Sequence, residues 1–276
     1  MQKPTVDVII PAYNAQDFIL HAIQSVKSQT YPARIIVVDD GSTDQTGKMV
    51  KGAFEADPSV RYIRKENGGL SSARNLGITE STATLVAFLD SDDMWLPSKL
   101  SQQVQLFQDS TDSKLGVVYC DFEHIDLLGH RLPNQPRFHM NPSIRGEVFN
   151  QLLCGNYVAG SGSAVLVKRE CFQVVGGFDE AFPSCEDWDM WVRLAQNYHF
   201  EYVRKPLVLI RRHSTAMNRN ARRMFAGYAM FFNKWAPIAC KRPRVLISWL
   251  RHLVSRQTPI AALEFTTRFL RKKLAR

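Results

Sequence analysis

Three acidic residues lie within four positions at Asp90-Ser91-Asp92-Asp93, directly after an apolar run at residues 85–89. In an extended chain alternate side chains point to the same side, so Asp90 and Asp92 are expected to face together. Carboxylates that close repel one another unless a cation lies between them, and Mg²⁺ or Mn²⁺ accepts carboxylate, phosphate and water oxygens. The alternative is a solvated acidic turn at a helix N-terminus. The apolar run favours the metal site, because a buried strand would carry the acids to the edge of a sheet.

A second acidic pair, Asp39-Asp40, ends another apolar run. Gly41 next to it is typical of a tight turn, and the three polar residues that follow are candidate caps of the next helix. A turn accounts for residues 41–44 but not for two adjacent acids. A carboxylate that accepts hydrogen bonds from a nucleobase imide or a ribose hydroxyl does account for them.

These acids require elements that bring them to one place. Strands are predicted at residues 6–11, 34–39, 60–64 and 85–90, with helical periodicity between them, and Asn14 is expected to cap the first helix. Later strands are predicted at 116–122 and 163–167, and a helix at 186–196. The alternation indicates an α/β fold with a mostly parallel, Rossmann-like central sheet, in which binding sites lie beyond the carboxyl ends of the strands.

Six motifs follow one another along the first 191 residues. As an ordered set they resemble the family 2 glycosyltransferases of the GT-A fold, and the likeness covers roughly residues 5 to 213. The motifs are IIPAYN at 9–14, VDDGSTD at 38–44, ENGGLSSARN at 66–75, LDSDD at 89–93, GGFDE at 176–180 and EDWDMW at 186–191.

The resemblance implies a nucleotide site and a metal site. The nucleotide site would be formed by Pro11, Ala12, Tyr13, Asp39, Asp40, Arg74, Asn75, Asp90 and Ser91. Asp90 matches a position that faces either the ribose or the metal. Asp92 matches the metal ligand, and the metal would bridge the donor diphosphate. Arg74 has an alternative reading as a helix surface residue.

Two further residues acquire roles from the same resemblance. Asp187 matches the family's general base, although an acid in the first turn of a helix also suits the helix dipole. His213 lies in an Arg-x-His tract that resembles a flexible loop near the diphosphate. It is expected to contact phosphate or metal, and the alternative is an exposed loop histidine. Trp188 and Trp191 are expected to be core or acceptor-wall residues.

The implied reaction is chemically coherent. An acceptor hydroxyl is a poor nucleophile at neutral pH and needs a carboxylate to take its proton. The leaving nucleoside diphosphate gains negative charge, which Mn²⁺ or Mg²⁺ stabilises. One base and one metal site imply a single displacement with inversion at the anomeric carbon. The expected donor is a nucleotide sugar, UDP-linked by default, and the expected acceptor is a saccharide or a lipid-linked saccharide in cell-surface polysaccharide or glycolipid synthesis.

Competing functions fit less well. A sugar nucleotidyltransferase would show a Gly-rich basic signature where Pro11-Ala12-Tyr13-Asn14 stands. An aspartyl phosphatase would carry its Asp-x-Asp near the N-terminus. A nucleic-acid-binding module is not expected, because no such motif occurs and the first 203 residues hold 17 Lys and Arg against 25 Asp and Glu.

Charge and cysteine usage indicate the compartment. The 276 residues carry a net charge of +9, and residues 204–276 hold 18 Lys and Arg but a single acid, Glu264. Five cysteines without a C-x-x-C pair predict neither a disulfide framework nor a zinc ribbon and favour a reducing compartment. Neither a signal peptide nor a membrane-spanning run is expected. We expect a cytoplasmic protein.

The basic C-terminal region is predicted to form amphipathic helices at residues 243–256 and from Thr258 onward. In the first helix, Leu246, Trp249, Leu250 and Leu253 would oppose a face with Arg244, Ser248, Arg251 and Ser255. Residues 243–276 would then hold the enzyme on the anionic cytoplasmic face of a membrane. The alternative is that both helices pack on the catalytic domain. The expected division is a catalytic domain at 1–213, with halves at 1–110 and 111–213, and an extension at 214–276.

Overall fold

The computed structural model describes residues 3–132, 144–158, 160–213 and 220–255. One sheet with the strand order β3-β2-β1-β4-β7-β6-β8-β5 forms its centre. The strands are β1 (Val6–Ala12), β2 (Arg34–Asp39), β3 (Val60–Arg64), β4 (Leu85–Phe88), β5 (Met94–Trp95), β6 (Leu115–Ile125), β7 (Val165–Lys168) and β8 (His199–Arg211).

The sheet is parallel in its first half and mixed in its second. Strands β3, β2, β1 and β4 run parallel, β7 is antiparallel to both β4 and β6, and β8 pairs parallel with β6 and antiparallel with β5. The prediction of a mostly parallel α/β sheet is therefore confirmed for β1 to β4. The carboxyl ends of β1, β2 and β4 meet at one edge of the sheet, with Ala12 opposite Asp39.

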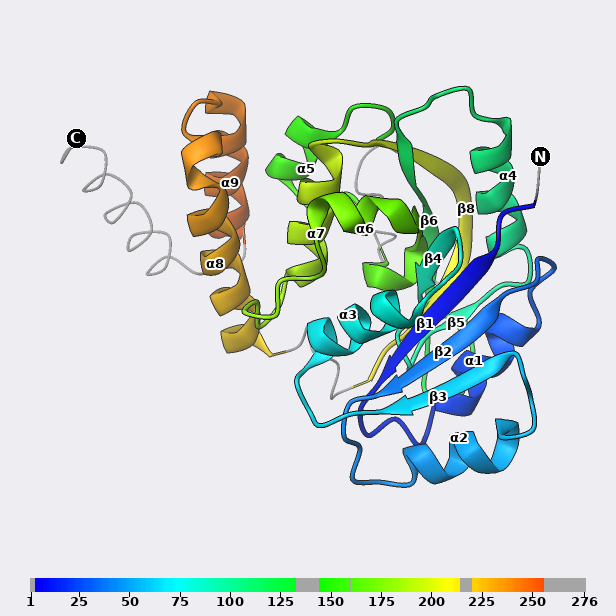
Figure 1. Ribbon diagram of the computed structural model, residues 1–276. Helices are drawn as coiled ribbons and strands as arrows, with labels where there is room; N and C mark the ends of the chain where they lie inside the picture. The colour runs from blue at the N-terminus through cyan, green and yellow to red at the C-terminus, as the bar shows by residue number, and fades with distance from the viewer. Residues whose placement is uncertain (1–2, 133–143, 159, 214–219, 256–276) are drawn as a thin grey trace.

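Helices cover both faces of the sheet (Figure 1). Alternation along β1 sends Val8 and Ile10 to one hydrophobic core and Ile9 to the other. The first core packs against α1 (Ile19–Lys27), α2 (Thr46–Phe54) and α4 (Lys99–Asp109). The second packs against α3 (Leu70–Glu80), α5 (Phe149–Cys154), α6 (Arg169–Val175) and α7 (Glu186–Ala195). The predicted helix at 186–196 is confirmed.

The predicted cap at Asn14 is wrong. Helix α1 begins at Ile19, and Asn14 has a left-handed φ of 50°. Its Oδ1 accepts from the Thr43 amide at 2.8 Å, while its own amide donates to the Ser42 hydroxyl at 3.0 Å. Asn14 therefore ties the end of β1 to the turn after β2, because partners far along the chain satisfy its side chain better than a helix start would.

Two C-terminal helices, α8 (Ala221–Ala239) and α9 (Pro243–Ser255), lie side by side beyond α5 and α7 (Figure 1). The helix predicted at 243–256 is confirmed, and its predicted faces hold for exposed Arg244 and buried Trp249 but not for Ser248. Ser248, assigned to the outward polar face, donates to the Cys154 carbonyl at 2.9 Å, and Trp249 is buried with its indole on the Leu153 carbonyl. The helix predicted from Thr258 lies outside the described residues.

The remaining expectations concern thiols and membrane spans. All five cysteines are free, and Cys120, Cys171 and Cys185 are buried. No helix among the described residues combines the length and the apolar composition that crossing a bilayer requires.

Candidate active site

The predicted nucleotide residues begin at the carboxyl end of β1. Pro11 and Ala12 are buried in the strand, whereas the side chain of Tyr13 is 53% exposed directly after it. The Asp40 amide donates to the Ala12 carbonyl at 2.8 Å, which brings the ends of β1 and β2 together. Tyr13 thus presents an exposed aromatic ring at the edge where the predicted acids gather.

Asp39 and Asp40 are buried, and each carboxylate has partners within the chain. Asp39 accepts from the Ser42 amide at 2.8 Å and from the Tyr62 hydroxyl. Asp40 accepts from Lys65 Nζ at 2.8 Å and from two backbone amides, those of Gly68 at 2.9 Å and Gly69 at 2.7 Å. The two acids therefore shape the turn after β2 and the loop before α3, and their contact with a nucleotide stays a prediction.

The four residues after Leu89 form the acid cluster that the sequence indicates. Asp90, Ser91 and Asp92 are half-buried, and Asp93 is buried. Asp93 accepts from the Ser163 hydroxyl at 2.7 Å and from the Arg211 amide at 3.1 Å. Burial and the neighbouring Asp92 and Asp90 charges raise the pKa of Asp93 well above its usual value. Negative charge is crowded here, as the sequence predicts.

Asp92 and His213, the two predicted metal ligands, lie together although 121 residues separate them. Asp92 Oδ2 is 2.7 Å from His213 Nε2. Within the described residues no group of three His, Cys, Asp or Glu side chains is arranged to hold an ion. A site with few protein ligands suits a cation that also takes substrate phosphate and water oxygens. A carboxylate oxygen is a ligand that both Mg²⁺ and Mn²⁺ accept, and binding of either ion by this pair stays a prediction.

Arg211 holds this pair in place, a role that the sequence did not reveal. Its guanidinium donates to the Asp92 carbonyl at 2.9 Å and to the carbonyls of Asp126 and Leu127 at 2.9 and 2.8 Å. It also lies over the ring of Phe18 at 4.7 Å. The guanidinium of Arg211 is thus taken up by backbone carbonyls, and His213, two residues later, contacts the Asp92 carboxylate.

Arg74 connects the acid cluster to the start of α7. Its side chain is 0% exposed, so the alternative reading as a helix surface residue is wrong. One terminal nitrogen donates to Asp90 at 2.7 Å and the other to Glu186 at 2.9 Å, with 112 residues between Arg74 and Glu186. Both acids keep the guanidinium charged, because their charges and hydrogen bonds raise its pKa against the effect of burial.

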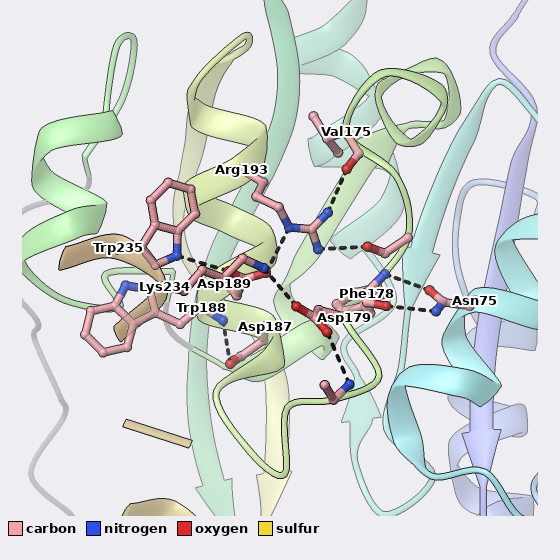
Figure 2. A network of polar contacts seen from close by, with 12 residues as sticks. Asn75, Val175, Phe178, Asp179, Asp187, Trp188, Asp189, Arg193, Lys234 and Trp235 are labelled. Atoms are coloured by element: carbon pink, nitrogen blue, oxygen red, sulfur yellow. Dashed lines mark hydrogen bonds and ion pairs between the residues drawn. The ribbon is translucent and has the colours of Figure 1, made fainter. Parts of the chain in front are cut away.

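Asn75, the residue after Arg74, anchors a loop. Its amide oxygen accepts from the Phe178 amide at 2.7 Å, and its amide nitrogen donates to the Phe178 carbonyl at 2.9 Å (Figure 2). The same nitrogen also donates to Glu180 at 2.9 Å. These contacts fix the GGFDE segment against α3. The predicted nucleotide contact of Asn75 stays a prediction.

Asp187 stands in the first turn of α7, partly exposed. Its Oδ1 accepts from the Trp188 amide at 2.7 Å and its Oδ2 from Asn156 Nδ2 at 3.3 Å. Burial, reinforced by the Glu186 charge, raises the pKa of Asp187 to about 7, while Arg74 opposes the rise. A carboxylate with a pKa near neutrality has the property that a general base needs.

The helix that carries Asp187 is held by side chains of its own and of α8 (Figure 2). Buried Asp189 accepts from Arg193 at 2.8 Å, from Lys234 at 2.9 Å and from the Trp235 indole at 3.0 Å. Trp188, buried as predicted, stacks on Phe231 of α8 with ring centroids 3.8 Å apart. Trp191 is likewise buried. The contacts from α8 escaped sequence reasoning, because nothing in a basic helix indicates which acid it meets.

Comparison with known sequences gives matches over most of the chain. Residues 7–176 match the family model described as Glycosyl transferase family 2. An uncharacterized glycosyltransferase of Rickettsia felis is 31% identical over 76% of this chain, which spans about a third, 35%, of that relative. One from Rickettsia prowazekii is 29% identical over 91% of this chain and 77% of its own length. A chondroitin synthase of Escherichia coli is 27% identical over 73% of this chain and 28% of its own length.

Solved structures share the fold at low sequence identity. Staphylococcus aureus TarS 1–349 has a TM-score of 0.68 and 18% identity, covering 92% of this chain and 73% of that one. The mannosyltransferase PcManGT from Pyrobaculum calidifontis, solved with GDP-Man and Mn²⁺, has a TM-score of 0.62 and 20% identity, covering 97% and 80%. TarS 1–349 has also been solved with UDP-GlcNAc and has a TM-score of 0.62.

Proposed function

The chain belongs to glycosyl transferase family 2, and we propose that it transfers a sugar from a nucleotide-sugar donor to an acceptor hydroxyl by a single, inverting displacement. Asp187 is the general base. Asp92 and His213 would hold the metal. The nucleotide lies against Pro11, Ala12, Tyr13, Asp39, Asp40, Arg74, Asn75, Asp90 and Ser91, within a catalytic domain at 1–213 that has a donor half at 1–110 and an acceptor half at 111–213.

One observation carries this proposal: the buried Arg74 bridge. It joins Asp90, in the acid cluster, to Glu186, the neighbour of Asp187. The bridge therefore links the segment that carries Asp92 to the helix that carries Asp187, and we place the anomeric carbon of a bound donor between these two segments. Positioning of this kind lowers a reaction barrier because the reacting atoms are already oriented.

In the proposed reaction, proton transfer, bond formation and departure of the diphosphate occur in one displacement. Asp187 accepts the proton of the acceptor hydroxyl as the acceptor oxygen bonds to the anomeric carbon. The bond from that carbon to the diphosphate oxygen breaks, and its electron pair leaves with the nucleoside diphosphate. A metal held by Asp92 and His213 would supply positive charge to the departing diphosphate. Because a single carboxylate acts and no covalent sugar–enzyme bond forms, the anomeric configuration inverts.

The donor and the acceptor are narrowed by the relatives. Structural neighbours have been solved with UDP-GlcNAc and with GDP-Man, and we propose a UDP-sugar as the donor. Similarity to a chondroitin synthase supports a saccharide acceptor, free or lipid-linked, in cell-surface polysaccharide or glycolipid synthesis. Donor choice depends on a few atoms of pocket shape, so it must be measured.

The basic C-terminal extension, residues 214–276, is proposed to hold the enzyme peripherally on the anionic cytoplasmic face of a membrane through residues 243–276. Burial of Trp249 removes one apolar anchor, so the attraction must be mainly electrostatic. Arg244 is exposed on α9, and Ile247 is 49% exposed. Each nearby Lys or Arg contributes about 1 kcal/mol at such a surface. Liposome sedimentation tests this: binding must need anionic lipid, weaken with salt and fall when residues 243–276 are removed.

The enzymatic proposal is tested by a donor screen. The protein is incubated with UDP-GlcNAc, UDP-glucose and GDP-mannose, with Mn²⁺ or with excess chelator, and both hydrolysis and unfolding temperature are recorded. Metal-dependent turnover of one donor, together with its thermal stabilisation, supports the proposal. No stabilisation and no turnover of any donor would reject it.

A further inference from the structure

Asn156 is a polar residue next to the base that the reaction scheme does not yet use. It follows α5, and its Nδ2 donates to Asp187 Oδ2 at 3.3 Å. The preceding turn is fixed by two indoles, since the Trp188 and Trp249 side chains donate to the Leu152 and Leu153 carbonyls, both at 2.6 Å. The backbone beside Asn156 is therefore held in register with α7 and α9.

The other end of the Asn156 amide is unusual. Its Oδ1 is buried and has no hydrogen-bond partner among the described residues. Leaving a buried acceptor unpaired is unfavourable, so satisfying its own polar groups does not account for this residue. An ionised carboxylate only accepts hydrogen bonds, so the amide nitrogen must face Asp187 and the oxygen must turn away. The polar contact described for this side chain thus serves Asp187.

We propose that Asn156 is a positioning residue that orients the Asp187 carboxylate toward the acceptor hydroxyl and favours its ionised form. This inference rests on the proposed role of Asp187 as base. The charged groups around Asp187 pull in opposite directions: Glu186 on α7 disfavours its charge, whereas Arg74 on α3 favours it. On α8, Lys234 is engaged by Asp189 and Asp179, and Tyr228 packs against Trp188. Asn156 supplies a neutral donor to Oδ2 of Asp187, whereas the Trp188 amide of the helix backbone donates to Oδ1.

Unfolding temperature against pH tests the contact without any need for turnover. Asn156→Ala is compared with the parent protein from pH 5 to pH 9, in the natural sequence and in an Asp187→Asn background. The lost donor matters only to an ionised carboxylate, so the decrease in Tm must be larger at pH 8.5 than at pH 5. In the Asp187→Asn background the decrease must be the same at every pH.

A matched control is available in α5. Asn150 is exposed, and its Oδ1 accepts from Arg242 at 2.9 Å. Asn150→Ala must show a pH-independent change in Tm. If Asn156→Ala also shows one in the natural sequence, Asn156 is only a structural residue and the inference is overturned.

The pH dependence of kcat/KM gives the catalytic readout, measured with whichever of UDP-GlcNAc or GDP-mannose is turned over. Asn156→Ala must move the ionisation midpoint upward by about half a unit or more, because the charged form loses a donor. The isosteric Asn156→Asp must move it further, since a second carboxylate repels the first. Affinity for the donor must stay unchanged, and an unmoved midpoint would overturn the inference.

The two measurements separate this inference from the proposed function. If Asp187→Asn retains full transfer, the assignment of the base fails whatever Asn156 does. If Asp187→Asn loses transfer but Asn156→Ala lowers Tm equally at every pH and leaves the midpoint of kcat/KM unmoved, the assignment of the base stands and the role of Asn156 fails.

Discussion

The two ends of the candidate site differ in how much freedom the chain leaves them. At the metal end, Asp92 and His213 are partly exposed and contact each other. The Arg211 side chain donates a hydrogen bond to the backbone carbonyl of Asp92. At the base end, Asp187 lies beside buried Glu186 on a helix whose Asp189 has three side-chain donors. Asp187 is partly exposed as well, so the two ends differ less in exposure than in how firmly neighbouring side chains hold the segment that carries each acid.

Environment, rather than residue type, separates the roles of these acids. Both ends consist of adjacent carboxylates at the start of a loop or helix. At the base end, burial raises the pKa of Asp187 to about 7. At the metal end, crowding raises the pKa of Asp93, which hydrogen bonds from Ser163 and Arg211 oppose. A bound cation reduces the repulsion between neighbouring carboxylates, whereas burial shifts the pKa of a carboxylate toward the range that a general base needs.

The largest effect is expected at the metal end. Asp92→Asn removes the carboxylate that contacts His213, so transfer should be largely abolished while the fold remains intact. Transfer rates with added Mn²⁺ and circular dichroism measure both. Asp109→Asn, a change at an exposed residue of α4, is the matched control and should keep full activity. Undiminished wild-type activity in excess chelator would contradict the assignment of this end.

The next effect concerns the base. Asp187→Asn keeps the shape of the side chain but cannot accept a proton, so kcat should fall by about 10²-fold or more. Donor affinity and metal dependence should be unchanged, because the metal end is intact. Titration of donor binding and single-turnover rates separate the two quantities. If the variant loses donor binding but keeps its rate at saturating donor, Asp187 binds the donor and is not the base.

Breaking the bridge between the ends should lower both the stability of the fold and the rate of transfer, and the loss of stability is the part that calorimetry measures directly. Arg74→Met leaves Asp90 and Glu186 without the guanidinium that contacts both. Breaking a buried ion pair on one side costs about 3–5 kcal/mol, equivalent to a decrease in Tm of about 10 °C at this chain length. Arg61→Met, which removes the ion pair between exposed Arg61 and Glu80, is the control. Calorimetry of both variants compares the decrease in Tm from losing a surface pair with the decrease from losing the Arg74 bridge. Similar changes in Tm for both variants would mean that Arg74 is not the link.

A smaller effect follows from the titration of Asp187. The base is active when ionised, so kcat/KM should rise tenfold per pH unit below the midpoint and level off above about pH 7. Asp187→Asn should abolish this rise. A profile of kcat/KM that is flat from pH 5 to pH 8 would contradict a base with a pKa of about 7.

The smallest predicted effect is a gain in stability. The folded-state pKa of Asp187 is raised from 3.8 to about 7, so its contribution to stability is complete below about pH 4 and is lost as the pH rises through 7. Asp187→Asn removes this loss, so at pH 8 the variant should melt at a higher temperature than the parent. At pH 4 the two should melt together. A lower Tm at pH 8 would contradict the cause assigned to the raised pKa.

Sequence reasoning reached the metal end more completely than the base end. Apolar runs that end in Asp39 and Asp90 predicted the strands and the edge where they meet, because alternation and burial are local properties. The pairing of Asp92 with His213 came from the resemblance, since 121 residues separate the two. Asn14 was misread as a cap because its partner, Thr43, is 29 residues away.

The base end depends on contacts that have no local signature. Arg74 meets Glu186 across 112 positions, and Lys234 meets Asp189 across 45. Neither arginine nor lysine indicates its partner in advance, so Arg74 kept an alternative reading as a surface residue. Asn156 gave no signal at all, because a single asparagine after a short helix is common in turns.

The stereochemistry of the product tests the central claim most directly. Once a donor is identified, proton NMR of the transferred sugar gives its anomeric configuration relative to the donor. A single displacement with Asp187 as base predicts the opposite configuration. A product that retains the donor's configuration would require a second nucleophile and would contradict the mechanism.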